Sequence, residues 1–383
     1  TGLISFFIPQ GGTVNLSPFN FAIVNERQQT LIAQASDLLS GNRTFQFEID
    51  TTSLFNSPFK LSQSGSGDGV ASWEIALLEA DSTVYYWRTR FQQPKVGEDT
   101  TWTLSSFIYI NNSPEGWSQA RFGQFETNTT DAGLTRNQPL KRWEFTSTEN
   151  LVEITTYGSD HPQSEAANIA VTIDGQPFIV STRLCPDNSI NAIAFDKAST
   201  VPYAVLTTGG FDVLDRNRCG RTPQAINTFQ PADITSDLML DTYLDQLPSS
   251  DYVILFSIGK VDYSDWNAST IAKLATIGLS TNEINTWQNG EAVIIVGRKG
   301  SDPGTASIVR GNPSLPTPLL AQEVMLSQVL TGKFDQGQLL SPKIGPAASW
   351  GTLYHQIRTE ASDQTTVSLL GITSNGTETT LFD

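Results

Sequence analysis

Alternation of apolar and polar residues over short segments is the dominant pattern in the first third of the chain. In residues 45–49, Phe45, Phe47 and Ile49 share one face, and residues 84–91 and 102–110 are longer segments rich in aromatic and β-branched residues. Segments of period two bury one face against a second sheet, and Gly, Asn, Asp, Ser and Pro separate them as in all-β sandwiches. We therefore expect a β-sandwich over residues 18–113, after an N-terminal segment of residues 1–17.

A second β-rich region follows. Residues 121–125, 143–145, 152–157 and 169–173 predict strands, and Asp174-Gly175 is a tight-turn dipeptide. Beyond the proline-rich residues 313–318, the strand pattern returns in residues 323–330, 350–358 and 366–372. Neither group has enough strands to close a sandwich alone. We expect residues 114–183 and 314–383 to form one discontinuous, jelly-roll-like sandwich, while three or four domains in series is the alternative.

Between these two groups the period of the pattern changes. Residues 234–247 predict a helix, because Leu240, Tyr243, Leu244 and Leu247 fall on one helical face, and residues 268–277 predict a second. Strands are expected at residues 190–195 and 203–207. Residues 252–258 and 292–296 are almost continuously apolar, which indicates strands buried on both faces. The predicted fold class is mainly β, with an inserted α/β module over residues 184–313.

Composition narrows the range of partners. The 383 residues carry 23 Lys and Arg against 39 Asp and Glu, a formal net charge of −16. Such a chain is repelled by phosphate backbones and anionic lipids, so we expect neither nucleic-acid nor membrane-surface binding. No apolar run reaches the roughly 18 residues of a membrane span. The chain begins at Thr1 without a signal peptide, and we expect a mature or cut product.

Residues that could support catalysis are few. The sequence lacks HExxH, Walker, GxSxG and CxxC motifs, and residues 65–69 (GSGDG) lack the Lys-Ser/Thr of a phosphate loop, which favours a hairpin tip. Two carboxylate pairs, Asp212 with Asp215 and Asp262 with Asp265, could serve as acid and base, although spacing alone is weak evidence. We therefore expect no enzyme, no cofactor and no metal.

The chain contains two cysteines, Cys185 and Cys219, in a sequence rich in Ser, Thr and Asn. This pattern favours one disulfide, which would stabilise the fold by roughly 3–4 kcal/mol. The alternatives are two free buried thiols, or a catalytic thiol that acts with His161 or His355.

Two domain resemblances rest on short motifs. The segments FEIDT (47–51), FNSP (55–58), DSTVYYWR (81–88) and SF (106–107) resemble a fibronectin type III domain, which implies a spacer or docking role without chemistry. Residues NAIAF (191–195), PSSDYVIL (248–255), LATIG (274–278), Trp287 and AVIIVGRKG (292–300) resemble the interleukin-like EMT inducer (ILEI) domain, which implies glycan binding. In those relatives Arg-Asp follows the Trp. Here Gln288-Asn289 stands in its place, which removes the charged sugar clamp.

The whole arrangement resembles the region after the peptidase domain in PorU-like proteins of type IX secretion systems. The motifs are NFAIV (20–24), GWSQ (116–119) with QF (124–125), CGR (219–221), and SPKIGPA (341–347) with Trp350. Those proteins carry a gingipain-type cysteine peptidase domain, whose His-Gly and Cys motifs this chain lacks. The resemblance implies a non-catalytic region at the bacterial cell surface, with secretion-system or cell-surface proteins as partners.

The alternative function is carbohydrate binding. Aromatic rings stack on sugars while amides and charged groups bind their hydroxyls. The candidate residues are Trp287, Gln288, Asn289, Arg298 and Lys299, with Trp266 and Tyr263 as second choices. In the competing interpretation, Trp287 caps the core and Arg298-Lys299 is a solvated hairpin tip.

Overall fold

The computed structural model describes residues 11–37, 41–203, 218–221, 226–347, 349–373 and 375–382. The prediction of a mainly β fold is confirmed, with 41% strand and 11% helix. Two compact units divide the chain, one over residues 1–342 and a smaller one over residues 343–383.

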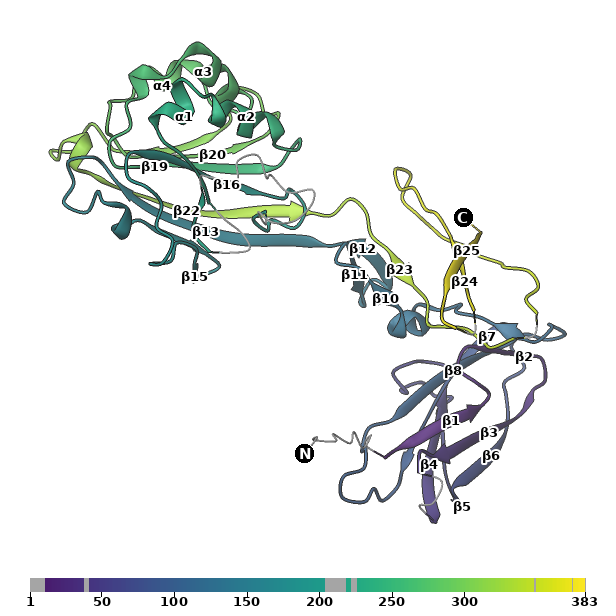
Figure 1. Cartoon of the computed structure of the whole chain (residues 1–383). Coiled ribbons are helices and arrows are strands. Elements are labelled where there is room, and N and C mark those ends of the chain that lie inside the picture. Colours follow the sequence, from purple (N-terminus) through teal and green to yellow (C-terminus); the bar gives the residue numbers. More distant parts are fainter. Residues whose placement is uncertain are drawn as a thin grey trace. The chain divides into compact units, whose positions relative to one another are not determined.

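The first β-sandwich contains two sheets (Figure 1). One has the order β1 (Thr13–Ser17), β3 (Gln28–Ala35) and β6 (Val70–Ala76). The other has the order β5 (Leu61–Asp68), β4 (Asn42–Asp50), β7 (Thr83–Phe91), β8 (Thr103–Tyr109), β2 (Ala22–Val24) and β9 (Gly116–Trp117). Their inner faces share one core, in which Leu31 of β3 packs with Phe45 and Phe47 of β4, as the alternation predicts.

Two details of this sandwich differ from the prediction. Strand β1 pairs with β3, so the sandwich includes residues 13–17, which the sequence pattern places in the N-terminal segment. Residues 65–69 are the end of β5 and a turn at Gly69, whose φ is +75°. This turn leads into β6 of the other sheet, so it connects two layers and is not a hairpin tip.

Strand β13 (Ser147–Tyr157) pairs antiparallel with β22 (Glu323–Lys333) over eleven residues on each strand. These strands belong to a four-stranded sheet of order β15 (Gln176–Pro177), β14 (Ala170–Ile173), β13 and β22. Segments from both predicted flanks therefore lie in one sheet, and the chain between them is an insertion into it.

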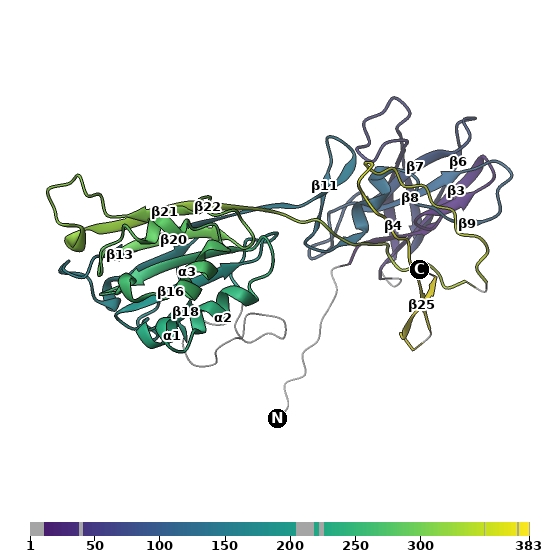
Figure 2. The same ribbon diagram turned by 90° about the horizontal axis from the view of Figure 1, so that it is seen from above.

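The inserted residues form a six-stranded antiparallel sheet. Its order is β17 (Arg218–Cys219), β18 (Ile226–Phe229), β16 (Ser189–Phe195), β19 (Tyr252–Ile258), β20 (Val293–Arg298) and β21 (Ser307–Arg310). Figures 1 and 2 show the helices on one face: α1 (Pro231–Thr235), α2 (Met239–Gln246), α3 (Ala268–Ala275) and α4 (Thr281–Ile284). The other face packs on the four-stranded sheet.

The alternating side chains of the central strands explain these three layers. In β19, Ile254 and Phe256 pack toward β13 and β22, whereas Val253 and Leu255 pack toward the helices. Each central strand is therefore apolar on both faces, as the continuous apolar segments predict. The expected jelly-roll needs a correction here. The flanks supply one layer, the four-stranded sheet, and the inserted module supplies the second layer that covers it.

Short elements complete the first unit. These are β10 (Thr129–Thr130) paired with β23 (Leu339–Leu340), β11 (Leu134–Asn137) paired with β12 (Arg142–Phe145), and the 3₁₀ turns η1 (Phe122–Thr127), η2 (Ala166–Asn168), η3 (Tyr263–Asp265) and η4 (Leu319–Ala321).

The segment at residues 121–125 was predicted to be a strand. It is helical because the Gln124 side chain accepts hydrogen bonds from the backbone N–H groups of Ala120 and Arg121. The predicted helix over residues 234–247 is two helices, broken where Leu238 has a φ of +52°.

The second unit contains one antiparallel hairpin, β24 (Leu369–Ile372) with β25 (Glu378–Phe382). The strand predicted at residues 350–358 is wrong. That segment has no regular structure and its side chains are exposed, so it has no buried face to pair along a sheet. The strand predicted at 203–207 lies mostly outside the described residues.

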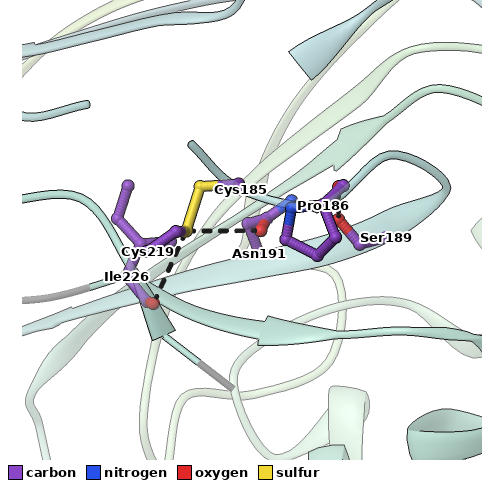
Figure 3. The surroundings of a disulfide bond; sticks show 6 residues. All are labelled: Cys185, Pro186, Ser189, Asn191, Cys219 and Ile226. Carbon is purple, nitrogen blue, oxygen red and sulfur yellow. Dashed lines mark hydrogen bonds between the residues drawn. A yellow bond between two sulfur atoms is a disulfide. The ribbon is translucent and has the colours of Figure 1, made fainter. Parts of the chain in front are cut away.

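The predicted disulfide is confirmed as a bonded pair, Cys185–Cys219 (Figure 3). Both cysteines are buried in the core between the two sheets. Cys219 lies in β17, and Cys185 lies four residues before β16. The bond therefore fastens the edge of the six-stranded sheet to the segment that leads into its centre.

Candidate functional site

The aromatic part of the predicted carbohydrate site is packed inside the protein. Trp287 follows α4, is 8% exposed, and contacts Tyr263 and Trp266 edge to face, with ring centroids 5.2 and 6.3 Å away. Tyr263 and Trp266 are also buried and contact each other at 5.2 Å. Burial raises the pKa of the Tyr263 hydroxyl, which donates a hydrogen bond to the backbone oxygen of Glu291.

A small cavity lies beside these rings. Its volume is about 10 Å³ and its lining is apolar, formed by the three aromatic side chains with residues of β16, β19 and β20. This is about the space of one water molecule, too small for a sugar ring. The aromatic cluster therefore packs the helices onto the sheet, and stacking a sugar on Trp287 would require it to rearrange.

The two polar residues after Trp287 differ in their environment. Gln288 is exposed. The Asn289 side chain accepts a hydrogen bond from the backbone N–H of Ser264 at 3.0 Å and donates one to the Ser264 hydroxyl at 2.8 Å. Asn289 thus ties the loop after α4 to the turn η3.

Arg298 and Lys299 lie at the opposite end of β20. The six residues of this strand, at about 3.3 Å each, separate its ends by roughly 17 Å. Lys299 Nζ donates hydrogen bonds to the Leu244 carbonyl near the end of α2, at 2.6 Å, and to Thr276 Oγ1 at 3.2 Å. Burial lowers the pKa of this lysine. The structure thus divides the five predicted residues between the two ends of the strand.

The other candidate residues for chemistry that the structure describes do not form a site. Asp262 pairs with Lys260 at 3.3 Å on an exposed turn, and Asp265 accepts a hydrogen bond from the Ser264 hydroxyl. Asp212 and Asp215 lie outside the described residues. His161 stacks on Tyr157, with ring centroids 4.5 Å apart.

His355 is exposed in the second unit. Within the described ranges, no group of three or more His, Cys, Asp or Glu residues could hold a metal ion. No helix among those residues is long and apolar enough to cross a membrane.

A groove that the sequence analysis did not predict contains Arg298. Its lining comes from three separate segments, and its volume is about 390 Å³. We call it the basic groove and define it by Lys197, Arg298, Thr331, Gly332, Lys333 and Asp335.

Close packing brings these segments together. A Cβ on Gly332 would lie 2.4 Å from the carbonyl oxygen of Ala198, so only glycine lets the end of β22 approach the loop after β16. The Tyr252 hydroxyl donates a hydrogen bond to the Thr331 carbonyl at 2.9 Å. The Arg298 guanidinium lies over the Tyr252 ring, 4.3 Å from its centroid, and its Nε donates to the Ser250 carbonyl at 3.2 Å.

Positive charge dominates the basic groove even though the whole chain is acidic. Among the residues that line the groove, three are cationic, Lys197, Arg298 and Lys333, and one is a carboxylate, Asp335. The distance from Lys197 Nζ to Asp335 Oδ2 is 3.8 Å, and both side chains are largely exposed. Such a pair is worth little in stability, and three cations against one carboxylate leave the lining with net positive charge. Only Arg298 was a sequence candidate, because no local motif connects Lys197 with Lys333.

No protein-family model matches this chain, and no curated protein matches its sequence.

Proposed function

We propose that this chain is a non-catalytic interaction and scaffold region at the bacterial cell surface, of the PorU-like type found in type IX secretion systems. In this proposal the first sandwich is a fibronectin type III-like spacer, and residues 184–313 are an ILEI-like module. The partners are secretion-system or cell-surface proteins. The buried disulfide is compatible with an oxidising, extracellular location.

The observation that carries the proposal is the exposure of large apolar side chains in residues 343–382. Trp350 is 60% and Tyr354 88% exposed. The same segment exposes Leu353, Ile357, Leu369, Leu370, Ile372, Leu381 and Phe382. Isolated exposed apolar residues are ordinary, but a concentration of them marks an interaction surface.

The second unit also has little internal support. Its only regular element among the described residues is the two-stranded hairpin β24–β25, and every side chain of β25 is exposed. An isolated hairpin is marginally stable in water. A partner surface that covers these side chains would therefore both order this unit and bury its apolar area.

A crosslinking and co-purification experiment tests the proposal. The full chain is displayed in a bacterium with a type IX secretion system, and captured proteins are identified by mass spectrometry. The test variant is Trp350→Ser combined with Tyr354→Ser. The control is Val96→Ser, which changes a fully exposed apolar residue of the first sandwich.

We expect the wild type and the control to capture secretion-system components, and the double variant to capture them at least about tenfold less, the effect of losing interface anchors. Failure of the wild type to capture any such component, or equal capture by both variants, would refute the proposal.

Carbohydrate binding through residues 184–313 is the alternative function. It has weaker support, since Trp287, Trp266 and Tyr263 are packed against one another. A glycan array that detects binding lost in Gln288→Ala would favour it.

A further inference from the structure

The basic groove presents an arginine that is already oriented. The Nε hydrogen bond to the Ser250 carbonyl and the stacking on Tyr252 hold the guanidinium of Arg298 in one plane. Among the described residues, its two terminal nitrogens make no hydrogen bond or ion pair beside the Nε bond. An arginine fixed in this way offers a planar pair of donors, the geometry that a carboxylate accepts with two hydrogen bonds.

The two lysines extend this positive surface. Lys333 is exposed, and its ammonium makes no ion pair within 4 Å among the described residues, although its charge acts on nearby Glu144. The Lys197 ammonium pairs with the largely exposed Asp335, while the Lys197 backbone N–H donates to Asp251 at 3.1 Å. A ligand that carries several negative charges would therefore meet three cations whose existing interactions cost little to replace.

The strand that lines the groove is also at the edge of its sheet. β22 pairs with β13 on one side, and no strand among the described residues pairs with its other side. The N–H of Phe334 donates to the Thr146 carbonyl at 2.9 Å, and the N–H of Gly158 donates to the Gln322 carbonyl at 3.0 Å. In an antiparallel pair, successive residues direct their backbone N–H and C=O groups to opposite sides of the strand. The backbone groups of the even-numbered residues of β22 therefore bond β13, and those of the odd-numbered residues point to the open edge.

Two backbone carbonyls on that open edge already accept hydrogen bonds from side chains of this protein. The Thr331 carbonyl accepts from Tyr252, and the Val329 carbonyl accepts from the exposed side chain of Gln328 at 2.8 Å. The backbone groups of Met325 and Ser327 remain on the open side. An extended peptide can pair with such an edge through its main chain, which a polysaccharide cannot do.

We propose that the basic groove and the adjoining edge of β22 bind an acidic, extended peptide segment of a partner protein. One carboxylate is held by Arg298, further carboxylates lie near Lys197 and Lys333, and the peptide main chain lies along the edge of β22. This inference rests on the proposed interaction function, and it names the chemistry of one partner segment.

The test measures binding of a short fluorescent peptide in which Glu and Val alternate to the full chain, by fluorescence anisotropy at low and high salt. A peptide with Gln in place of Glu is the ligand control. We expect the Glu peptide to bind the wild type, with affinity that falls as salt rises, and the Gln peptide to bind at least about tenfold more weakly.

Variants then locate the site. We expect Arg298→Gln to weaken binding of the Glu peptide about tenfold, the effect of losing hydrogen bonds to a charged group. Arg298→Lys should restore only part of this loss, because it keeps the charge but not the planar donors. Lys333→Gln should weaken binding less. Asp335→Asn should strengthen it, because it removes the one negative charge among the residues that line the groove. Lys260→Gln is the control outside the groove, and we expect it to leave binding unchanged.

Three results would overturn the inference. They are no binding of the Glu peptide, equal effects of Arg298→Gln and Lys260→Gln, or tighter binding of oligogalacturonate than of the peptide, which would make the ligand an acidic carbohydrate. These outcomes can be distinguished from those of the co-purification test. The peptide test uses the purified chain with substitutions in residues 1–342, whereas the co-purification test changes Trp350 and Tyr354 in the second unit. A chain that binds the peptide yet captures no secretion component would refute the proposed function alone.

Discussion

A buried ion pair in the first sandwich gives a quantitative prediction about stability and pH. Arg43 of β4 binds Glu98 through two contacts of 2.6 and 2.7 Å, and its guanidinium lies over the Phe91 ring at 3.9 Å. Their side chains are only 6% and 15% exposed. The hydrogen bonds from Arg43 lower the pKa of the Glu98 carboxyl from 4.5 to about 2.

This pKa difference sets the size of the effect. Each tenfold change in proton affinity corresponds to about 1.4 kcal/mol, so ionised Glu98 contributes about 3 kcal/mol to the free energy of unfolding at neutral pH. Because the folded-state pKa is below the unfolded one, this contribution is complete above pH ~4.5 and is lost as the pH falls toward about 2. At pH ~3 we expect less than half of it to remain.

The perturbation is Glu98→Gln, and the control is Glu79→Gln, whose pair with Arg27 is exposed. The assay is amide hydrogen exchange in β7, which reports the stability of this sandwich separately from the other domains. We expect Glu98→Gln to destabilise by 2 to 3 kcal/mol at about pH 7, and the control by less than about 1 kcal/mol. Equal effects of the two variants, or a wild-type advantage over Glu98→Gln that is undiminished at low pH, would refute the reasoning.

Two further predictions concern the α/β module. Replacing Cys185 and Cys219 by Ser removes a crosslink between residues that are 34 positions apart in sequence. This should lower the free energy of unfolding by about 4 kcal/mol. An unchanged midpoint of urea unfolding would contradict this prediction. Trp287→Ala should destabilise the module by about 3–5 kcal/mol, because it removes a buried indole from the aromatic cluster, whereas Gln288→Ala should be nearly neutral. Thermal unfolding of both variants measures this contrast, and similar losses would contradict burial of Trp287.

Some features were predictable because the signal lies within a few neighbouring residues. The continuously apolar residues 252–258 indicated a strand buried on both faces, and β19 is one. The two cysteines indicated a disulfide, which the structure contains. Local patterns predicted strands wrongly in two places. In η1 the Gln124 side chain binds the backbone and bends it into a helical turn. In residues 350–358 no neighbouring strand among the described residues is present to pair with the segment.

The candidate site shows the limit of spacing arguments. Trp287 and Arg298 are close in sequence, yet β20 separates them, because an extended strand moves its ends apart by several ångströms per residue. Conversely, Lys197, Arg298 and Lys333 are far apart in sequence and line one groove. The packing of Gly332 against the Ala198 carbonyl, and the hydrogen bond from Tyr252 to the Thr331 carbonyl, bring their segments together.

The sequence by itself determined most of the strands and helices, which of their faces are apolar, and that the two cysteines pair, because each depends on the periodicity or chemistry of the residues themselves. The tertiary structure decided which layers cover one another, that the predicted sugar-binding aromatics are buried, and that a positive groove forms on an acidic chain. These outcomes depend on strand register and on close contacts between distant segments, which residue periodicity does not encode.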